Sequence, residues 1–582
     1  MSTRRNFLQG AATLGTVLAA NPALAFWGAT KVPTPEEYVA RQGPKFLEKV
    51  LFPWIRIETT SDSDAGNPEG CKLGAEFLRD ELTGSGFSAR TIDLPDGNPL
   101  VFAERIVDPS LPTVLLYGHY DVQLADPAQW VLGGKQLKPF EPTVIDGRVY
   151  ARGAIDNKGP IGTHLLAARY FDQHGSPCNV KFLVEGDEER GGSPSSKFVT
   201  EHADLLASDL LIVSDTKTLR GGHPCLTTSL KGIVIGTATA EDPKDLIELI
   251  HNAHDPQENR VLLPGFYDRV VDQRIPKRVL DEFGAPEEGM GDILRPETGY
   301  AQLEHRWYRP TISPLSFIYA NQKPSNTENK KTVRITAHGP NIIEHSGVYG
   351  GPVQEPALYL SHLLTGLKEE GIEYDLDFIH YGTGKVQTKI RPTGDAQITI
   401  DESVNIDDVI TRVARKYNLA RELLEVNNVG ERRAYLGEER FGESSYTPTA
   451  ILSFRIVGNQ DPQEVLSSLD TLAEITSKDI TVEPVHAGPA FKTSIDNPYI
   501  QAVSAGLQKG YGTDGVHTMG VGGSIPIIEA FHQTLGIPIA LAGFASPDAN
   551  YHGSLENMRK IDFYNGTQSM IHALKNVGQL QR

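Results

Sequence analysis

The sequence contains little cysteine. Its 582 residues include only three, Cys71, Cys178 and Cys225. Three thiols cannot build a framework of disulfides, and none of them belongs to a Cys-x-x-Cys pair of the kind that binds metal. Any metal site must therefore use His, Asp and Glu side chains. The sequence also has no run of about 18 uninterrupted apolar residues, so we expect no membrane domain.

Basic residues are fewer than acidic ones. Lys and Arg number 55 and Asp and Glu number 74, which gives a formal net charge of -19. Such an acidic chain is a poor match for nucleic acid or for an anionic membrane, so we expect neither as a main partner. A hydrophobic fraction of 39% with 22% charged residues excludes a fibrous or wholly disordered chain. The length indicates more than one domain, at about 100–200 residues for each.

The first 25 residues have the pattern of a targeting signal. Arg4 and Arg5 precede a weakly apolar run at residues 11–20, and an Ala-Leu-Ala sequence ends at Ala25. The paired arginines predict a twin-arginine-type signal peptide over residues 1–25, and hence a periplasmic or secreted protein. An ordinary secretory signal, or a helix that packs on the first domain, is the alternative interpretation of the same residues.

Two segments, residues 26–229 and 485–582, alternate strands with helices. Short apolar runs at residues 114–117, 180–184, 210–213 and 537–542 predict buried strands. The patterns at residues 160–172 and 562–578 predict helices. This alternation is typical of an α/β domain with a mostly parallel sheet, in which we expect the catalytic site.

The segment between them, residues 230–484, has a different pattern. Apolar residues at helical spacing start at Leu360 and at Ile406, and Asp461 with Pro462 has the form of a helix start. Alternating stretches between these helices predict strands. We therefore predict an α+β domain, enlarged by its long connections, that is inserted into the first domain. Residues 271–330, rich in proline, glycine and charge, are expected to form long surface loops. We find no internal repeat in the sequence.

Seven acidic or imidazole side chains follow the predicted strands of the α/β domain or precede its first long helix. Ligands bind beyond the carboxyl ends of strands in open α/β sheets, so these residues, although distant in the sequence, are expected to converge. A single such residue is more often structural, and the prediction depends on their recurrence at several strand ends. They are His119, Asp121, Asp156, Glu188, Glu189, Asp215 and His552.

Two imidazoles and several carboxylates without a thiol suit a pair of divalent metal ions, Zn²⁺ first and Mn²⁺ or Co²⁺ as alternatives. Two ions a few ångströms apart need a bridging ligand, and Asp156 is the natural candidate. Of the adjacent pair Glu188 and Glu189, one carboxylate can bind metal while the other accepts a proton. Asp121 is placed to orient the imidazole of His119.

Five motifs together resemble the carnosinase and aminoacylase-type family of di-zinc metallopeptidases, in its dipeptidase-like branch. The motifs lie at residues 118–123, 152–159, 185–189, 453–462 and 522–526. The resemblance implies that His119 and Asp215 hold one metal ion, that Glu189 and His552 hold the other, and that Asp156 bridges them. It also implies that Glu188 is the general base and that Asp121 supports His119.

The resemblance also implies that the inserted domain, residues 230–484, serves as a lid and dimerisation domain, and it assigns residues outside the metal set. His345, in a Glu-His-Ser-Gly sequence, would stabilise the oxyanion in a partner's active site, which implies a homodimer. Arg455 would bind the substrate carboxylate, and Ser524 would contact the substrate terminus. The sequence differs from the usual pattern of this family in two places. His345 follows the strand that starts near Lys231 by far more residues than is usual, and the final motif at His552 lacks its usual Asn.

We therefore expect an exported di-zinc metallo-exopeptidase that hydrolyses short peptides, in the manner of a dipeptidase or carboxypeptidase. An N-acyl-amino-acid deacylase is the alternative, because the same metal chemistry would serve it. A periplasmic solute-binding protein that has lost catalysis is a third possibility, but an intact general base at Glu188 argues against it. The expected partners are a small peptide or N-acyl amino acid and a second copy of the chain.

Overall fold

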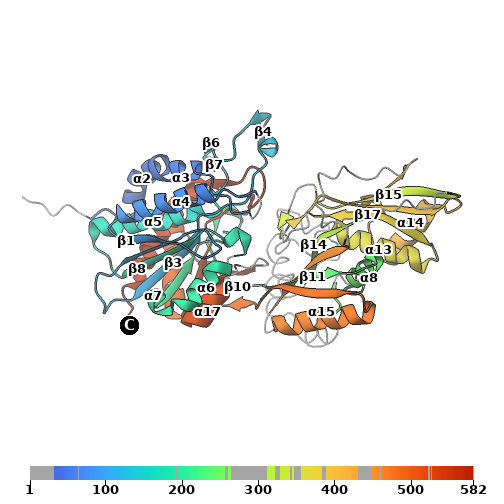
Figure 1. Cartoon of the computed structure of the whole chain (residues 1–582). Coiled ribbons are helices and arrows are strands. Elements are labelled where there is room, and N and C mark those ends of the chain that lie inside the picture. The colour runs from blue at the N-terminus through green and yellow to red at the C-terminus, as the bar shows by residue number, and fades with distance from the viewer. Residues whose placement is uncertain are drawn as a thin grey trace, which may run out of the picture.

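Two lobes make up the protein in the computed structural model (Figure 1), each built around its own β-sheet. The structure describes residues 32–62, 65–191, 193–255, 260–263, 311–321, 328–340, 344–345, 355–382, 389–429, 447–457, 460–521, 525 and 527–580. Among these residues, no helix combines the length and the apolar character that crossing a membrane requires.

A nine-stranded mixed sheet forms the first lobe, in the order β1-β2-β8-β3-β9-β25-β10-β23 with β24 paired to β10. The four central strands, β8, β3, β9 and β25, are parallel, and the strands on either side of them turn antiparallel. The strands are β1 Ser88–Ile92, β2 Leu100–Arg105, β3 Thr113–His119, β8 Asn179–Glu185, β9 Leu210–Val213, β10 Cys225–Leu230, β23 Phe491–Lys492, β24 His517–Val521 and β25 Ile539–Ala542.

The four central strands match the four apolar runs in the sequence. Every residue of β3, β8, β9 and β25 is buried, because helices cover both faces of the sheet. The predicted helices are also present, as α5 (Lys158–His174) and α18 (Lys560–Val577). The α/β class predicted for this lobe is confirmed, with a parallel centre and antiparallel flanks.

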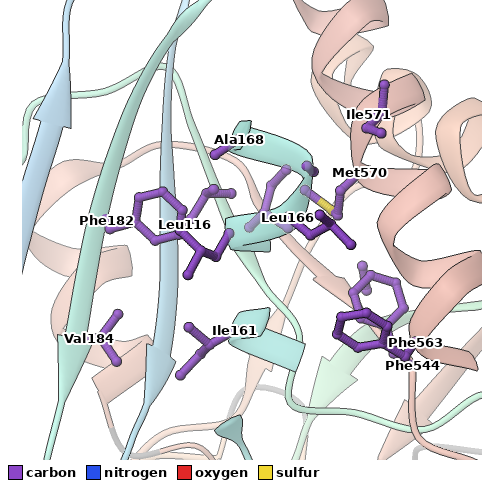
Figure 2. Packing of buried hydrophobic residues seen from close by; sticks show 14 of the residues in the cluster. Leu116, Ile161, Leu166, Ala168, Phe182, Val184, Phe544, Phe563, Met570 and Ile571 are labelled. Carbon is purple, nitrogen blue, oxygen red and sulfur yellow. The ribbon is translucent and has the colours of Figure 1, made fainter. Parts of the chain in front are cut away.

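Helices α5 and α18 cover one face of this sheet. Figure 2 shows side chains from the strands packed against α5, and α5 packed in turn against α18. The labelled residues include Leu116 and Phe182 in the sheet, Ile161 and Leu166 in α5, and Met570 in α18. The opposite face packs against α6 (Ser193–Glu201) and α17 (Ile527–Leu535). This three-layer packing fixes the strand ends that carry the site.

An eight-stranded antiparallel sheet forms the second lobe, in the order β20-β15-β19-β17-β14-β21-β11-β22. Its strands are β11 Gly232–Thr239, β14 Thr311–Ala320, β15 Lys330–His338, β17 Tyr374–Tyr381, β19 Thr393–Asp401, β20 Leu424–Val429, β21 Thr449–Ile456 and β22 Thr481–Gly488. Its helices are α8 Pro243–Asn252, α13 Pro356–Glu369, α14 Ile406–Lys416 and α15 Pro462–Thr476. The chain enters this lobe after Leu230 and leaves it between Gly488 and Phe491.

One expectation about this lobe needs correction. Residues 311–320 are not a surface loop but the strand β14, which lies inside the sheet between β17 and β21. Pro314 conceals this strand in the sequence, and the register with β21 shifts between Pro314 and Ser316, where a proline can be accommodated. The order of elements in the lobe repeats, although the sequence shows no repeat.

The helix start predicted at Asp461 is confirmed, since its side chain accepts a hydrogen bond from the Gln463 amide.

Candidate metal centre

The carboxyl ends of the four parallel strands carry the predicted site. His119 is the last residue of β3, Asp215 follows β9 by two residues, and Glu189 lies in a short 3₁₀ turn after β8. His552 lies in the loop that follows β25, and Asp156 lies just before the start of α5. Because parallel strands end at the same edge of the sheet, the fold brings these five residues together.

Asp156 lies at the centre of this group. Its Oδ1 is 3.1 Å from Nε2 of His119, and its Oδ2 is 3.1 Å from Nε2 of His552. Nε2 of His119 also lies 3.8 Å from Oδ2 of Asp215, and Nε2 of His552 lies 3.2 Å from Oε2 of Glu189. The result is two groups of three potential metal ligands that share Asp156, each with its ligand atoms within 4.8 Å of one another.

Asp121 holds the imidazole of His119 from behind. Nδ1 of His119 lies 3.0 Å from the backbone carbonyl of Asp121 and 3.3 Å from its Oδ1. The other carboxylate oxygen of Asp121 accepts hydrogen bonds from the Ser61 hydroxyl at 2.7 Å and from the Glu189 amide at 3.0 Å. Since Nδ1 faces Asp121, Nε2 is the nitrogen that faces Asp156, an arrangement common for metal-binding histidines.

Two amide side chains that the sequence analysis overlooked orient further carboxylates. Nε2 of Gln123 donates to Oε2 of Glu189 at 2.8 Å, and Nδ2 of Asn157 donates to Oδ1 of Asp215 at 3.1 Å. Both amides belong to the motifs that contain His119 and Asp156. Their role could have been suspected from that position, but only the folded chain shows which carboxylate each one contacts.

A buried ion pair joins the loop of Asp156 to the loop of His552. Arg152 donates to Oε2 of Glu556 at 2.7 Å, and the same guanidinium donates to the His552 carbonyl at 3.2 Å. The other oxygen of Glu556 accepts the backbone amides of Ile155 at 2.9 Å and Asp156 at 3.1 Å. Sequence reasoning did not predict this contact, because the two residues are about four hundred positions apart.

Burial and neighbouring charges shift the pKa values of several side chains in the site. Burial, and next the charge of Asp156, raise the pKa of the Asp215 carboxyl to about 7. Burial raises the pKa of Glu188 well above its usual range; His119 opposes this rise and Glu189 adds to it. Burial alone would lower the pKa of His552, but the charges of Glu189 and Asp156 raise it to about 10.

These residues fit divalent metal ions. The four carboxylates at positions 156, 188, 189 and 215 carry the charge that two divalent cations would neutralise, and the donor atoms are imidazole nitrogens and carboxylate oxygens. Zn²⁺, Mn²⁺ and Co²⁺ accept such a set. Without cations, burial favours the protonated form of two of these acids, which is what the raised pKa values of Asp215 and Glu188 describe. The pKa values of Asp156 and Glu189 are lowered instead, because the neighbouring imidazoles offset their burial.

Three predicted site residues lie outside this cluster or cannot be placed. Arg455 lies in β21 of the second lobe and is only 1% exposed. Burial lowers its pKa to about 10, against the opposing charge of Glu355. The backbone of His345 forms a short strand paired with Lys389, and its side chain is outside the description. Ser524 lies outside the described residues.

Comparison with known proteins gives consistent results. The model of Peptidase family M20/M25/M40 matches residues 115–576. The chain is 31% identical over 359 residues to a Beta-Ala-His dipeptidase of Rattus norvegicus, which spans 53% of this chain and 71% of that protein. It is 28% identical over 287 residues to a Cys-Gly metallodipeptidase of Schizosaccharomyces pombe, which spans 44% of this chain and 59% of that protein.

The fold is also similar to that of a solved dipeptidase. The crystal structure of human carnosine dipeptidase 1 superimposes with a TM-score of 0.62 and 18% sequence identity, and the match covers 94% of this chain and 98% of that one. At this identity the likeness concerns the fold alone, namely a large mixed sheet with a separate antiparallel sheet. It confirms the fold class predicted from the sequence.

Proposed function

Because this chain belongs to Peptidase family M20/M25/M40, and is therefore a hydrolase of peptide bonds, we propose that it is a dipeptidase that works with two divalent metal ions. The observation that carries this proposal is Asp156, whose two carboxylate oxygens each face a different imidazole at 3.1 Å. A shared carboxylate between two sets of ligands is the arrangement that a two-metal site requires.

Each residue of the cluster has a part in this proposal. His119 and Asp215 would hold one ion, Glu189 and His552 the other, and Asp156 both. Ions held there would lower the pKa of a water molecule toward about 7 and polarise the scissile carbonyl. Asp121 keeps the His119 ring oriented through its Nδ1. Gln123 and Asn157 keep the carboxylates of Glu189 and Asp215 oriented.

Glu188 would move the proton. It precedes Glu189 in the short turn after β8, and its pKa is sensitive to the charges of His119, Glu189, Asp215 and Asp156. A carboxylate in that place can take the proton of the attacking water and pass it to the leaving amine of the peptide. The raised pKa of Glu188 in the protein alone would fall once cations neutralise its acidic neighbours.

Short peptides are the proposed substrates because the relatives are dipeptidases. A panel should contain β-Ala-His, Cys-Gly and other dipeptides, tripeptides, and N-acyl amino acids, assayed with protein loaded with Zn²⁺ or Mn²⁺. We expect hydrolysis of dipeptides. Hydrolysis confined to N-acyl amino acids would contradict the dipeptidase and favour a deacylase.

The Glu188→Gln variant tests the assignment of the base. We expect its turnover to fall by at least ~100-fold while its metal content remains that of the unmodified protein, because the amide cannot accept a proton. Glu201→Gln, at an exposed position of α6, is the matched control and should keep full activity. Unchanged turnover in Glu188→Gln would end the assignment.

We also propose export by the twin-arginine route, which the sequence of residues 1–25 supports. The Arg4→Lys/Arg5→Lys variant should remain in the cytoplasm, since that route reads the arginine pair. Cell fractionation and the mass of the mature N-terminus measure this directly. Export of that variant at the normal rate would contradict the proposal.

A further inference from the structure

The second lobe consists of two units with the same order of elements. The first unit is β11-α8-β14-β21-α15-β22, and the second is β15-α13-β17-β19-α14-β20, inserted between β14 and β21 of the first. Within the described residues, each follows the pattern strand, helix, strand, strand, helix, strand. This pattern leaves aside the 3₁₀ turn Arg421–Leu423 and four two-residue strands that pair outside the main sheet, namely His254–Asp255, Arg260–Val261, Glu344–His345 and Lys389–Ile390. In each, the strands lie in the sheet in the order fourth, first, third, second, with every pairing antiparallel.

The two units meet through equivalent elements. The second strand of each, β14 and β17, pair antiparallel from Phe317 opposite Tyr381 to Ala320 opposite Phe378. The first helix of each, α8 and α13, lie side by side, and Lys368 of α13 pairs with Glu248 of α8 at 3.0 Å. Each element thus contacts its equivalent in the other unit, and the paired strands run antiparallel. This is the geometry of a two-fold symmetric dimer interface.

This junction is a packed core. A single hydrophobic cluster runs across it and includes Leu246 and Phe317 of the first unit and Leu363 and Ile379 of the second, all nearly or fully buried. An interface as apolar as a domain interior is characteristic of permanent association, so the two units form one body.

The outer edges of the sheet are poorly suited to pairing with another chain. The edge strand β20 exposes Glu425, Asn427 and Asn428, and the edge strand β22 exposes Glu483 and Pro484 with a shift of register. Charged residues, proline and irregular register are the features that block strand pairing at an edge. The edge of β14, which would otherwise be open, is covered by the second unit of the same chain.

The Glu-His-Ser-Gly sequence around His345 belongs to the second unit. It lies between β15 and α13, the connection from the first strand to the first helix. The equivalent connection of the first unit, residues 240–242, reads Ala-Glu-Asp and contains no histidine. This explains why His345 comes so late after Lys231, because it follows the first strand of the inserted unit.

We propose that the second unit takes the place of the lid of a partner subunit, so that one chain forms the complete enzyme and His345 serves the metal centre of its own chain. The dimer that the sequence resemblance implied is then unnecessary. The role of His345 rests on the proposed peptidase function. The claim that one chain forms the complete enzyme rests on the arrangement of the two units alone.

Mixing two inactive variants tests the origin of His345. Glu188→Gln lacks the base and keeps His345, and His345→Ala has the opposite defect. The two are expressed together with different tags and purified through both tags in sequence and, separately, as the total pool. If His345 acted across a dimer, random mixing would restore about a quarter of the normal activity in the pool. We expect no restoration and no doubly tagged species.

The same experiment needs a control and a physical measurement. His338→Ala, at a partly exposed position of β15 in the same unit, should keep normal activity, while the activity of His345→Ala should fall by at least ~100-fold. Sedimentation of the unmodified protein should give the mass of one chain, and its specific activity should stay constant on dilution from micromolar to nanomolar.

Each possible outcome decides a separate part. Restored activity in the mixture, a mass of two chains, or activity lost on dilution would overturn the proposal. Full activity of His345→Ala would overturn the role of His345. If the unmodified protein hydrolyses none of the panel, the proposed function fails, and sedimentation still decides whether one chain stands alone.

Discussion

Arg152 and Glu556 form a buried ion pair, with an N–O distance of 2.7 Å and side chains only 3% and 0% exposed. The guanidinium also donates to the carbonyls of His552 and Gly553, and the carboxylate accepts the backbone amides of Ile155 and Asp156. Two potential metal ligands that are far apart in the sequence are thus held by one contact. His552 itself adopts a left-handed backbone conformation with φ of 58°, which is uncommon for a residue with a side chain and requires such support.

Removing this contact should weaken metal binding without touching a ligand. We expect Glu556→Gln to lower metal affinity by ~10–100-fold, because the loops of Asp156 and His552 lose their common anchor. Competition with a chromogenic chelator measures this affinity. Asp548→Asn, which breaks an exposed pair with Arg148, is the matched control and should change little. An unaltered affinity in Glu556→Gln would show that the loops are held by other contacts.

Metal binding should depend strongly on pH. In the protein alone the pKa of His552 is raised to about 10 and that of Asp215 to about 7, so His552 is protonated at neutral pH and Asp215 partly so. A metal ion must displace these protons, and affinity should therefore fall by up to about tenfold per proton for each unit that the pH is lowered from 8 to 6. Calorimetry in buffers of different ionisation enthalpy counts the released protons. An affinity independent of pH over this range would contradict the assigned ligands.

Three histidines at the junction of the two units of the second lobe should make the stability of this lobe sensitive to acid. His362 lies between His251 and His254, at 2.9 and 3.0 Å, and a chain of neutral imidazoles satisfies both contacts. Burial, and then the charges of its two neighbours, lower the pKa of His362 well below its usual range. Burial also lowers the pKa of His251, although the charge of Glu369 opposes this shift.

The sign of this effect follows from the lowered pKa. The unfolded chain takes up a proton on His362 at about pH 6.5, before the folded chain does, so the contribution to stability is complete above that pH and is lost as the pH falls below it. Urea unfolding of the metal-free protein at pH 7.5 and pH 5.5 should show the loss, and His362→Gln should reduce the difference. His338→Gln, at a partly exposed position outside this cluster, is the control. The same pH dependence in all three proteins would refute this explanation.

Much of the first lobe was predictable from the sequence because its strands are buried on both faces. Residues 210–213 are uniformly apolar and form β9 with the predicted bounds, and the candidate ligands follow the strand ends where an α/β sheet places them. What the sequence does not contain is the partner of each side chain. Neither Glu556 nor Gln123 can be linked to its contact by spacing, because these contacts exist only after folding.

The second lobe was harder to predict for a different reason. Its repeat lies in the order of elements and not in the residues, since an antiparallel sheet with one buried face specifies only where apolar side chains alternate. The strand β14 contains Pro314, which is typical of a loop, so the sequence pattern shows only part of the first unit. In the sequence, the inserted unit is visible only as an unusually long stretch of chain between Lys231 and His345.

The number of metal ions bound by one chain tests the central claim most directly. Elemental analysis of protein saturated with Zn²⁺ and freed of excess ions should give two ions per chain for the unmodified protein. Asp156→Ala should bind neither ion tightly, since both groups of ligands contain that carboxylate. A single ion in the unmodified protein, or two ions retained in Asp156→Ala, would contradict the shared two-metal centre.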